Sequence, residues 1–159
     1  MIKDIYIIDS SSLMELNKHN AMDVYISVWK NINELIKNDR LIAPKEVLNE
    51  IQGYDDNLAK WGKEQKKLFK NPTSEQIEIV KRILKEYPAL INVDAKHSAD
   101  PWVIALAITS QVTLIKVKRI VVTEEKLRGS KVKIPYVCSK MDIESIDIVE
   151  LFRAEDWKF

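Results

Sequence analysis

The chain has 159 residues, of which 46% are hydrophobic and 31% charged, and its 25 basic and 24 acidic side chains leave a formal net charge of +1. This length is typical of one domain with its own core, predicted to span 1–159, and the near-zero charge argues against tight, nonspecific binding of nucleic acid. The single cysteine, Cys138, excludes a disulfide framework and a thiolate zinc site. With no signal peptide ahead of the first apolar segment and no apolar run of roughly 18 residues, we expect a cytoplasmic protein that binds no membrane.

The segment Ile5–Ile8 predicts a strand buried on both faces, because its four residues are all apolar or aromatic. Asp9 follows at the carboxyl end of this strand, which is where an open α/β sheet binds its ligands. Ser10, Ser11 and Ser12 are expected to form the turn beyond it. Alternatively, Asp9 only ends the strand and caps the next element.

The stretch from 20 to 93 contains helix and strand signals in alternation. Helical spacing of apolar residues predicts a helix over 20–37, a short strand at 41–43, and a helix over 45–52 with Pro44 suited to its first turn. Beyond these we expect a polar, helix-containing excursion over 54–71, an amphipathic helix over 74–87 capped by Ser74, and a short extended piece at 90–93.

The last third of the chain adds the most buried helix. Asp100-Pro101 opens a helix over 102–109 that is apolar on nearly all sides, so we expect it in the centre of the fold. A buried strand over 119–123 ends before Glu124 and Glu125. Residues 134–138 predict an edge strand, since Pro135 cannot donate to a central ladder, and residues 146–152 predict a terminal helix. This alternation indicates an α/β sandwich with a mainly parallel sheet.

Four acids occupy comparable places in this topology: Asp9, Glu50, Asp100 and Glu125. Strand ends and the helix starts after them share one edge of a parallel sheet, where four carboxylates would repel unless cations lay between them. Oxygen ligands without cysteine favour Mg²⁺ or Mn²⁺ over zinc.

Each acid also has a purely structural interpretation. Asp100 before Pro101 is an ordinary helix start. Glu50 could be a solvated helix residue, with Glu46, one turn earlier, as the functional acid instead. Glu125 could belong, with Glu124, to a charged pair on a loop.

The ordered set resembles the PIN-domain nucleases. The resemblance rests on four segments: Ile7–Leu13, Pro44–Ile51, Ala99–Ala107 and Val121–Glu125. It implies a three-layer α/β/α sandwich around a mainly parallel sheet. It also implies a Mg²⁺- or Mn²⁺-dependent ribonuclease, of a family in which many members are toxins paired with an antitoxin and members are often dimers. Asp9, Glu50 and Asp100 match three metal-site acids of the family.

Glu125 departs from the family pattern, because it stands where the family usually has Asp. The charge is kept and the side chain is one methylene longer. A further acid that is common just downstream is absent, since Lys126-Leu127-Arg128 follows. A catalytically weak PIN-like module that acts through protein–protein contacts is therefore the alternative function.

The resemblance implies hydrolysis of RNA phosphodiester bonds at one or two metal ions held by Asp9, Glu50, Asp100 and Glu125, with Ser11 and Thr123 hydrogen-bonded to carboxylates or phosphate. A basic run surrounds the fourth segment and is either an RNA contact or a solvated surface: Lys116, Lys118, Arg119, Lys126, Arg128, Lys131 and Lys133. A haloacid-dehalogenase-like phosphatase is disfavoured, because it would need a second Asp at the position of Ser11. His19, His97 and Cys138 have no ligand or triad spacing, and we interpret them as structural.

Overall fold

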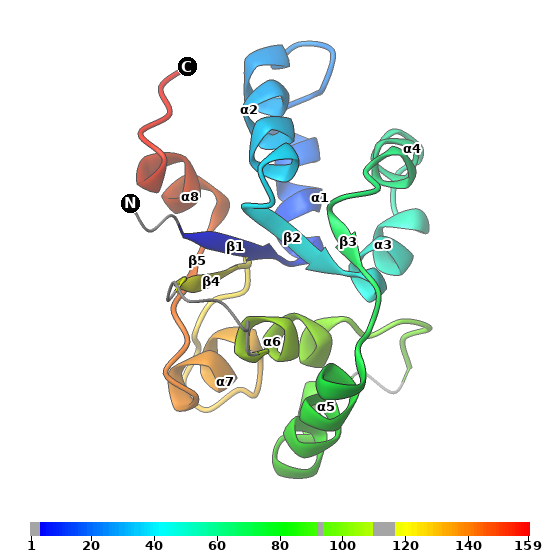
Figure 1. Ribbon diagram of the computed structural model, residues 1–159, viewed down its shortest axis with the longest axis vertical. Coiled ribbons are helices and arrows are strands. Elements are labelled where there is room, and N and C mark those ends of the chain that lie inside the picture. Colours follow the sequence, from blue (N-terminus) through cyan, green and yellow to red (C-terminus); the bar gives the residue numbers. More distant parts are fainter. Residues whose placement is uncertain (1–3, 92–93, 110–116) are drawn as a thin grey trace.

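The computed structural model describes residues 4–91, 94–109 and 117–159, which form a five-stranded, fully parallel sheet in the order β3-β2-β1-β4-β5 (Figure 1). The strands span Ile5–Ile8 (β1), Leu41–Pro44 (β2), Phe69–Lys70 (β3), Arg119–Val122 (β4) and Ser145–Ile146 (β5). In the register, Tyr6 of β1 pairs with Leu41 of β2 on one side and Ile120 of β4 on the other. The strand order reverses beside β1, so the carboxyl ends of β1 and β4 form the edge where such sheets bind ligands.

Helices cover both faces of this sheet. They span Ser10–His19 (α1), Ile26–Lys37 (α2), Lys45–Gln52 (α3), Asp56–Glu64 (α4), Ser74–Glu86 (α5), Asp100–Ile108 (α6), Ile134–Lys140 (α7) and Ile148–Ala154 (α8), with a short 3₁₀ helix at Pro88–Leu90. Figure 1 shows α1, α2, α4 and α8 above the sheet and α5, α6 and α7 below it, with α3 beside α4 at the β3 edge. The predicted three-layer α/β/α sandwich around a parallel sheet is confirmed. Within the described ranges, no helix is both long and apolar enough to span a bilayer.

Helix α6 is the central buried helix that the sequence predicts. It packs against β1, β2 and β4, and Val103, Ile104 and Ala105 are fully buried. A helix that contacts sheet and neighbouring helices on several sides needs apolar residues around its whole circumference. Its first residue, Asp100, is therefore held at the carboxyl edge of the sheet by a rigid, buried element.

Two predictions in the first third of the chain need correction, one of them only at the start of its helix. The serines after Asp9 form the first turn of α1 rather than a connecting turn, and the helix predicted over 20–37 begins only at Ile26. Helix α1 has a weak apolar pattern, because Ser10 and Ser12 occupy buried positions beside Leu13 and Leu16. Their hydroxyls have hydrogen-bond partners from distant parts of the chain, which a local pattern does not reveal.

The predicted edge strand over 134–138 is also wrong, because this segment begins helix α7. Pro135 lies in the first turn of α7, where a missing N–H leaves no hydrogen bond unmade. The edge position belongs to β5, which pairs with β4 through Val121 and Ser145.

The remaining segments differ from expectation in detail. The excursion over 54–71 contains α4, as expected, and ends in the edge strand β3. Thr73 caps α5 in place of Ser74, accepting a hydrogen bond from the N–H of Gln76 at 3.2 Å. The predicted extended piece at 90–93 begins at the end of the 3₁₀ helix, and its residues 92–93 lie outside the described residues. The predicted terminal helix is α8, which begins at Ile148.

Candidate metal centre

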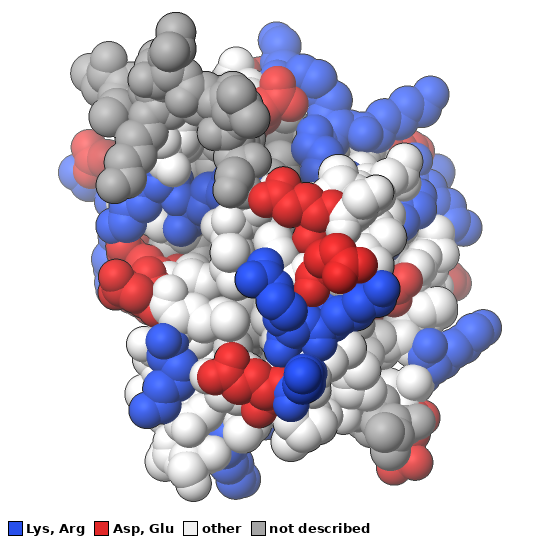
Figure 2. Space-filling view, turned by 60° about the horizontal axis from the view of Figure 1, so that its bottom comes forward, with Lys and Arg blue, Asp and Glu red and all other residues white. Residues whose placement is uncertain are grey.

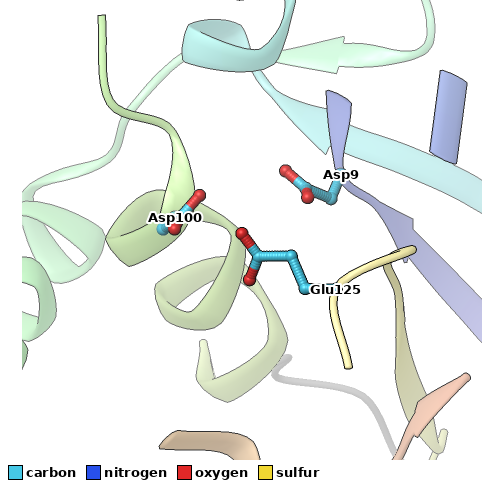
Figure 3. A group of neighbouring side chains, drawn as sticks. All are labelled: Asp9, Asp100 and Glu125. Carbon is cyan, nitrogen blue, oxygen red and sulfur yellow. The ribbon is translucent and has the colours of Figure 1, made fainter. Parts of the chain in front are cut away.

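Three of the four predicted acids converge at the carboxyl edge of the sheet. Asp9 follows β1, Asp100 begins α6, and Glu125 lies in the loop after β4. One carboxylate oxygen from each lies within 4.8 Å of the others, and Figure 3 shows the three side chains pointing into a common space. The topology produces this meeting, because β1 and β4 are neighbours and α6 crosses both of them.

Asp9 is the most tightly held of the three. It is 2% exposed, and its Oδ2 accepts hydrogen bonds from Ser11 Oγ at 2.7 Å and from Thr123 Oγ1 at 3.1 Å. Burial raises the pKa of Asp9, and the two hydroxyls counteract that rise. Its other oxygen, Oδ1, has a longer contact to Ser10 Oγ at 3.5 Å, and the backbone N–H groups of Ser10 and Ser11 also bond to the carboxylate. With respect to side-chain donors, Oδ1 is therefore the less occupied oxygen and the one more open to a cation.

The pKa of Asp100 is raised by its burial and by the neighbouring negative charges. Burial raises its pKa to about 8, with further contributions from the negative charges of Asp9 and Glu125. Within the described part of the chain, no group donates a hydrogen bond to its carboxylate, and its side chain does not cap α6. The positive charge of Lys133 offsets only part of this rise in pKa, and a bound cation would offset more of it.

The neighbouring acids Glu124 and Glu125 have separate roles. Glu125 faces the cluster and accepts a hydrogen bond from the N–H of Ile134 at 3.0 Å, while burial and the charge of Asp9 raise its pKa. Glu124 Oε2 instead accepts from Ser12 Oγ at 2.7 Å and from the N–H of Ile148 at 3.2 Å. Glu124 thus links α1 to α8 and does not point at the cluster.

Glu50 lies beside the three-acid group but is not part of it. Its Oε1 accepts a hydrogen bond from Ser10 Oγ at 3.0 Å, which places it one hydroxyl away from Asp9. Burial raises its pKa to about 7, and the charge of Asp9 adds to the rise. Glu46, one turn earlier, is occupied elsewhere, because it accepts from Asn49 at 2.8 Å and pairs with His97 at 3.5 Å.

Ser10 is the site residue that the sequence analysis did not single out. It joins the two acids Asp9 and Glu50, whereas Ser11 and Thr123 were predicted to bind carboxylates. The run of three serines after a buried strand was the available signal. The three serines have different partners because they form a helical turn, which directs consecutive side chains to different sides, and a loop was predicted there.

The donor set fits Mg²⁺ or Mn²⁺. All three grouped side chains offer carboxylate oxygens, which are the ligands that these hard cations prefer. Two oxygens bound to one Mg²⁺ lie at most about 4.2 Å apart, twice the metal–oxygen distance, so small side-chain rotations would bring the observed spacing within range. Water would complete the coordination.

The predicted basic residues fall into three groups. Lys118 pairs with Glu144 and Arg119 donates to the carbonyl of Leu106, so both are engaged at the amino end of β4. Lys116 lies outside the described residues. The other four lie between β4 and α7, close to Glu125: Lys126, Arg128, Lys131 and Lys133. On the face drawn in Figure 2, Lys and Arg side chains lie interspersed with Asp and Glu, in keeping with the net charge of +1.

A family model matches residues 6–159, nearly the whole chain, and describes the family as a domain of unknown function, DUF4411. The chain belongs to the DUF4411 family. No curated protein matches this DUF4411 chain significantly.

The DUF4411 chain is similar in fold to a chain in the crystal structure of VapBC2 from Rickettsia felis bound to a DNA fragment from their promoter. The TM-score is 0.50 and the identity 15%, and the alignment covers 90% of this chain and 98% of the other. This likeness confirms the PIN-like fold that the sequence segments imply. At this identity it concerns the fold alone.

Proposed function

We propose that this DUF4411 chain is a Mg²⁺- or Mn²⁺-dependent endoribonuclease that hydrolyses RNA phosphodiester bonds. The observation that carries the proposal is the convergence of Asp9, Asp100 and Glu125 within 4.8 Å at the sheet edge where α/β folds bind ligands. Like charges are costly to gather in this way, and such an arrangement is typical of a functional site.

In this mechanism the three grouped acids hold the metal. A bound Mg²⁺ or Mn²⁺ supplies a water of lowered pKa and shields charge on the scissile phosphate. Ser11 and Thr123 hold Asp9 through its Oδ2, so Asp9 would offer its Oδ1 to the metal. Glu50, joined to Asp9 through Ser10, extends the acidic surface and is the fourth proposed ligand, for the same ion or a second one.

The second part of the proposal is a toxin role with an antitoxin as the protein partner, and RNA as the substrate. The PIN-domain resemblance implies such a pairing, and the fold likeness to a VapBC2 chain supports it. Dimer formation is part of the same expectation. The cluster itself bears only on the nuclease chemistry.

The test is cleavage of a single-stranded RNA by the purified protein with millimolar Mn²⁺, beside the Asp9→Asn variant and a sample in EDTA. We expect cleavage by the wild-type protein with Mn²⁺, and none by the Asp9→Asn variant or by the sample in EDTA. An inactive wild-type protein that shows metal binding would favour the alternative, a catalytically weak module that acts through protein contacts. Induced expression in a bacterial host then tests the toxin role, with growth arrest expected for the wild type and not for Asp9→Asn.

A further inference from the structure

A small hollow adjoins the carboxylate cluster on the side of Glu125. Its volume is about 230 Å³, and it is lined by Glu124, Glu125, Lys126, Arg128, Lys131 and Lys133. Because Glu125 belongs both to the hollow and to the three-acid group, the two features are contiguous. Four cations therefore lie next to a site that is otherwise strongly acidic.

Two of these four cations already have carboxylate partners. Lys126 Nζ lies 2.9 Å from Asp147, and Lys133 Nζ lies 4.0 Å from Glu125. Arg128 and Lys131 are exposed, and neither has an ion-pair partner in the part of the chain that the structure describes. An unpaired cation beside a cluster of acids is available for an anionic ligand.

The backbone holds Arg128 and Lys131 together. The N–H of Lys131 donates to the carbonyl of Arg128 at 3.2 Å, which closes a four-residue turn. Gly129, the second residue of the turn, has a φ of +58°, a conformation that glycine adopts without strain. The ends of such a turn lie within about 7 Å of each other, so both cations project from one small, ordered platform.

We propose that Arg128 and Lys131 form a phosphate-binding subsite for the RNA backbone next to the scissile phosphate. The inference rests on the proposed ribonuclease function and deepens it, since it names the part of the substrate that this turn binds. An acidic centre repels a polyanion in the absence of metal, and two cations at its rim offset that repulsion. Phosphate contacts of this kind position the strand without reading its sequence.

The experiment measures binding separately from cleavage. Fluorescence anisotropy of a labelled single-stranded RNA is recorded over a salt series with the Asp9→Asn protein, and with the same protein carrying Arg128→Ala and Lys131→Ala. The slope of log K against log salt is negative, and each lost phosphate contact reduces its magnitude by about 0.7 for single strands, so the double change should reduce that magnitude by about 1.4. Lys30→Ala together with Lys37→Ala in the same background is the matched control for the loss of two charges, because both lysines are exposed on α2 and have no ion-pair partner among the described residues.

The same pair of substitutions in the active protein should raise KM several-fold for RNA cleavage, with kcat and the Mn²⁺-induced rise in Tm unchanged. A salt slope equal to that of the Lys30→Ala, Lys37→Ala control would overturn the inference, as would an Asp9→Asn protein that binds no RNA at low salt. A wild-type protein that binds RNA through these cations but never cleaves it would overturn the proposed nuclease and leave the subsite standing.

Discussion

Among the individual residues, Asp9 is held mainly by groups that follow it or lie far along the chain. Ser11 and Thr123 donate to its Oδ2, and Ser11 Oγ in turn accepts from the N–H of Glu124 at 3.0 Å. This chain of hydrogen bonds fixes Oδ2 and leaves Oδ1, among the described side chains, with only a longer contact from Ser10. A carboxylate held in this way loses little side-chain freedom when it binds a metal, which favours tight binding.

Asp100→Asn separates a helix-start role from a metal role. The Asp100 side chain makes no capping hydrogen bond among the described residues, so Asn loses none at this helix start, whereas removing one charge from the cluster relieves repulsion. We expect metal-free stability equal to or above that of the wild type, and RNA cleavage with Mn²⁺ lower by at least about 100-fold, roughly 2.7 kcal/mol of transition-state stabilisation. Thermal melts in EDTA and cleavage rates measure the two effects, and near-wild-type cleavage would return Asp100 to an ordinary helix start.

Glu50→Gln and Glu46→Gln form a matched pair on α3. Glu50 is bonded to Ser10 beside Asp9, while Glu46 is paired with Asn49 and His97. We expect Glu50→Gln to lower the cleavage rate by at least about 100-fold and Glu46→Gln to change it by less than about threefold, a difference of roughly 2 kcal/mol. Initial rates under identical Mn²⁺ concentrations test this, and the reverse ranking would assign the function to Glu46.

Among the elements, the loop after β4 combines structural and proposed catalytic roles in adjacent residues. Glu124 joins α1 and α8, and Glu125 turns to the opposite side, toward α6 and the N–H of Ile134 in α7. Successive side chains point to opposite sides of an extended backbone, and these two glutamates, just past the end of β4, contact different parts of the molecule. Through these two residues, the loop connects helices α1 and α8 to the three-acid group.

Glu124→Ala and Glu125→Ala should therefore have opposite consequences. Loss of Glu124 leaves the buried Ser12 hydroxyl without its acceptor, which should lower the free energy of unfolding by about 1–3 kcal/mol while cleavage is retained. Loss of Glu125 should lower cleavage strongly and stability less, because relieved repulsion offsets the lost hydrogen bond. Urea unfolding and cleavage rates measure both, and an inactive but fully stable Glu124→Ala protein would contradict the assignment.

For the whole molecule, the acids at the sheet edge link stability to pH and metal. The pKa of Glu50 rises from its ordinary 4.5 to about 7, and that of Asp100 from 3.8 to about 8. A carboxyl group whose pKa is raised by folding favours the folded state only while it is protonated. Its favourable effect is present at low pH and is lost as the pH rises through the folded-state pKa.

The metal-free protein should accordingly lose thermal stability between pH 5 and pH 8, and Mn²⁺ should restore it most at the high end. At a Mn²⁺ concentration of 100 times Kd, the gain would be about 2.7 kcal/mol. Melting curves in EDTA and in Mn²⁺ across this range test the expectation, and Asp9→Asn should remove most of the metal response. A Tm that does not respond to Mn²⁺ at pH 8 would mean that the acids do not bind it.

Much of the framework could be predicted from the sequence, because local patterns determine it. Helical spacing identifies α3 through its buried stripe, while length and residue type distinguish the short apolar strand Ile5–Ile8 from the longer, wholly apolar helix α6. The order of the acidic segments also identified the PIN-like fold. Short polar or proline-containing helices such as α1 and α7 were missed, since their buried serines and their proline depend on partners outside the local pattern.

Which acids meet was decided by the tertiary structure. Asp9 and Thr123 are 114 positions apart, and they touch because β4 pairs with β1 in the sheet. Glu124 and Glu125 are adjacent in sequence but contact different parts of the fold, Glu124 at Ser12 and Glu125 at the N–H of Ile134. On α3, the rotation of the helix places Glu50 beside Ser10 and Glu46 beside His97. Residue types and spacing show that carboxylates are present near strand ends, but distances between them follow from strand order and helix rotation, which depend on packing of the whole chain.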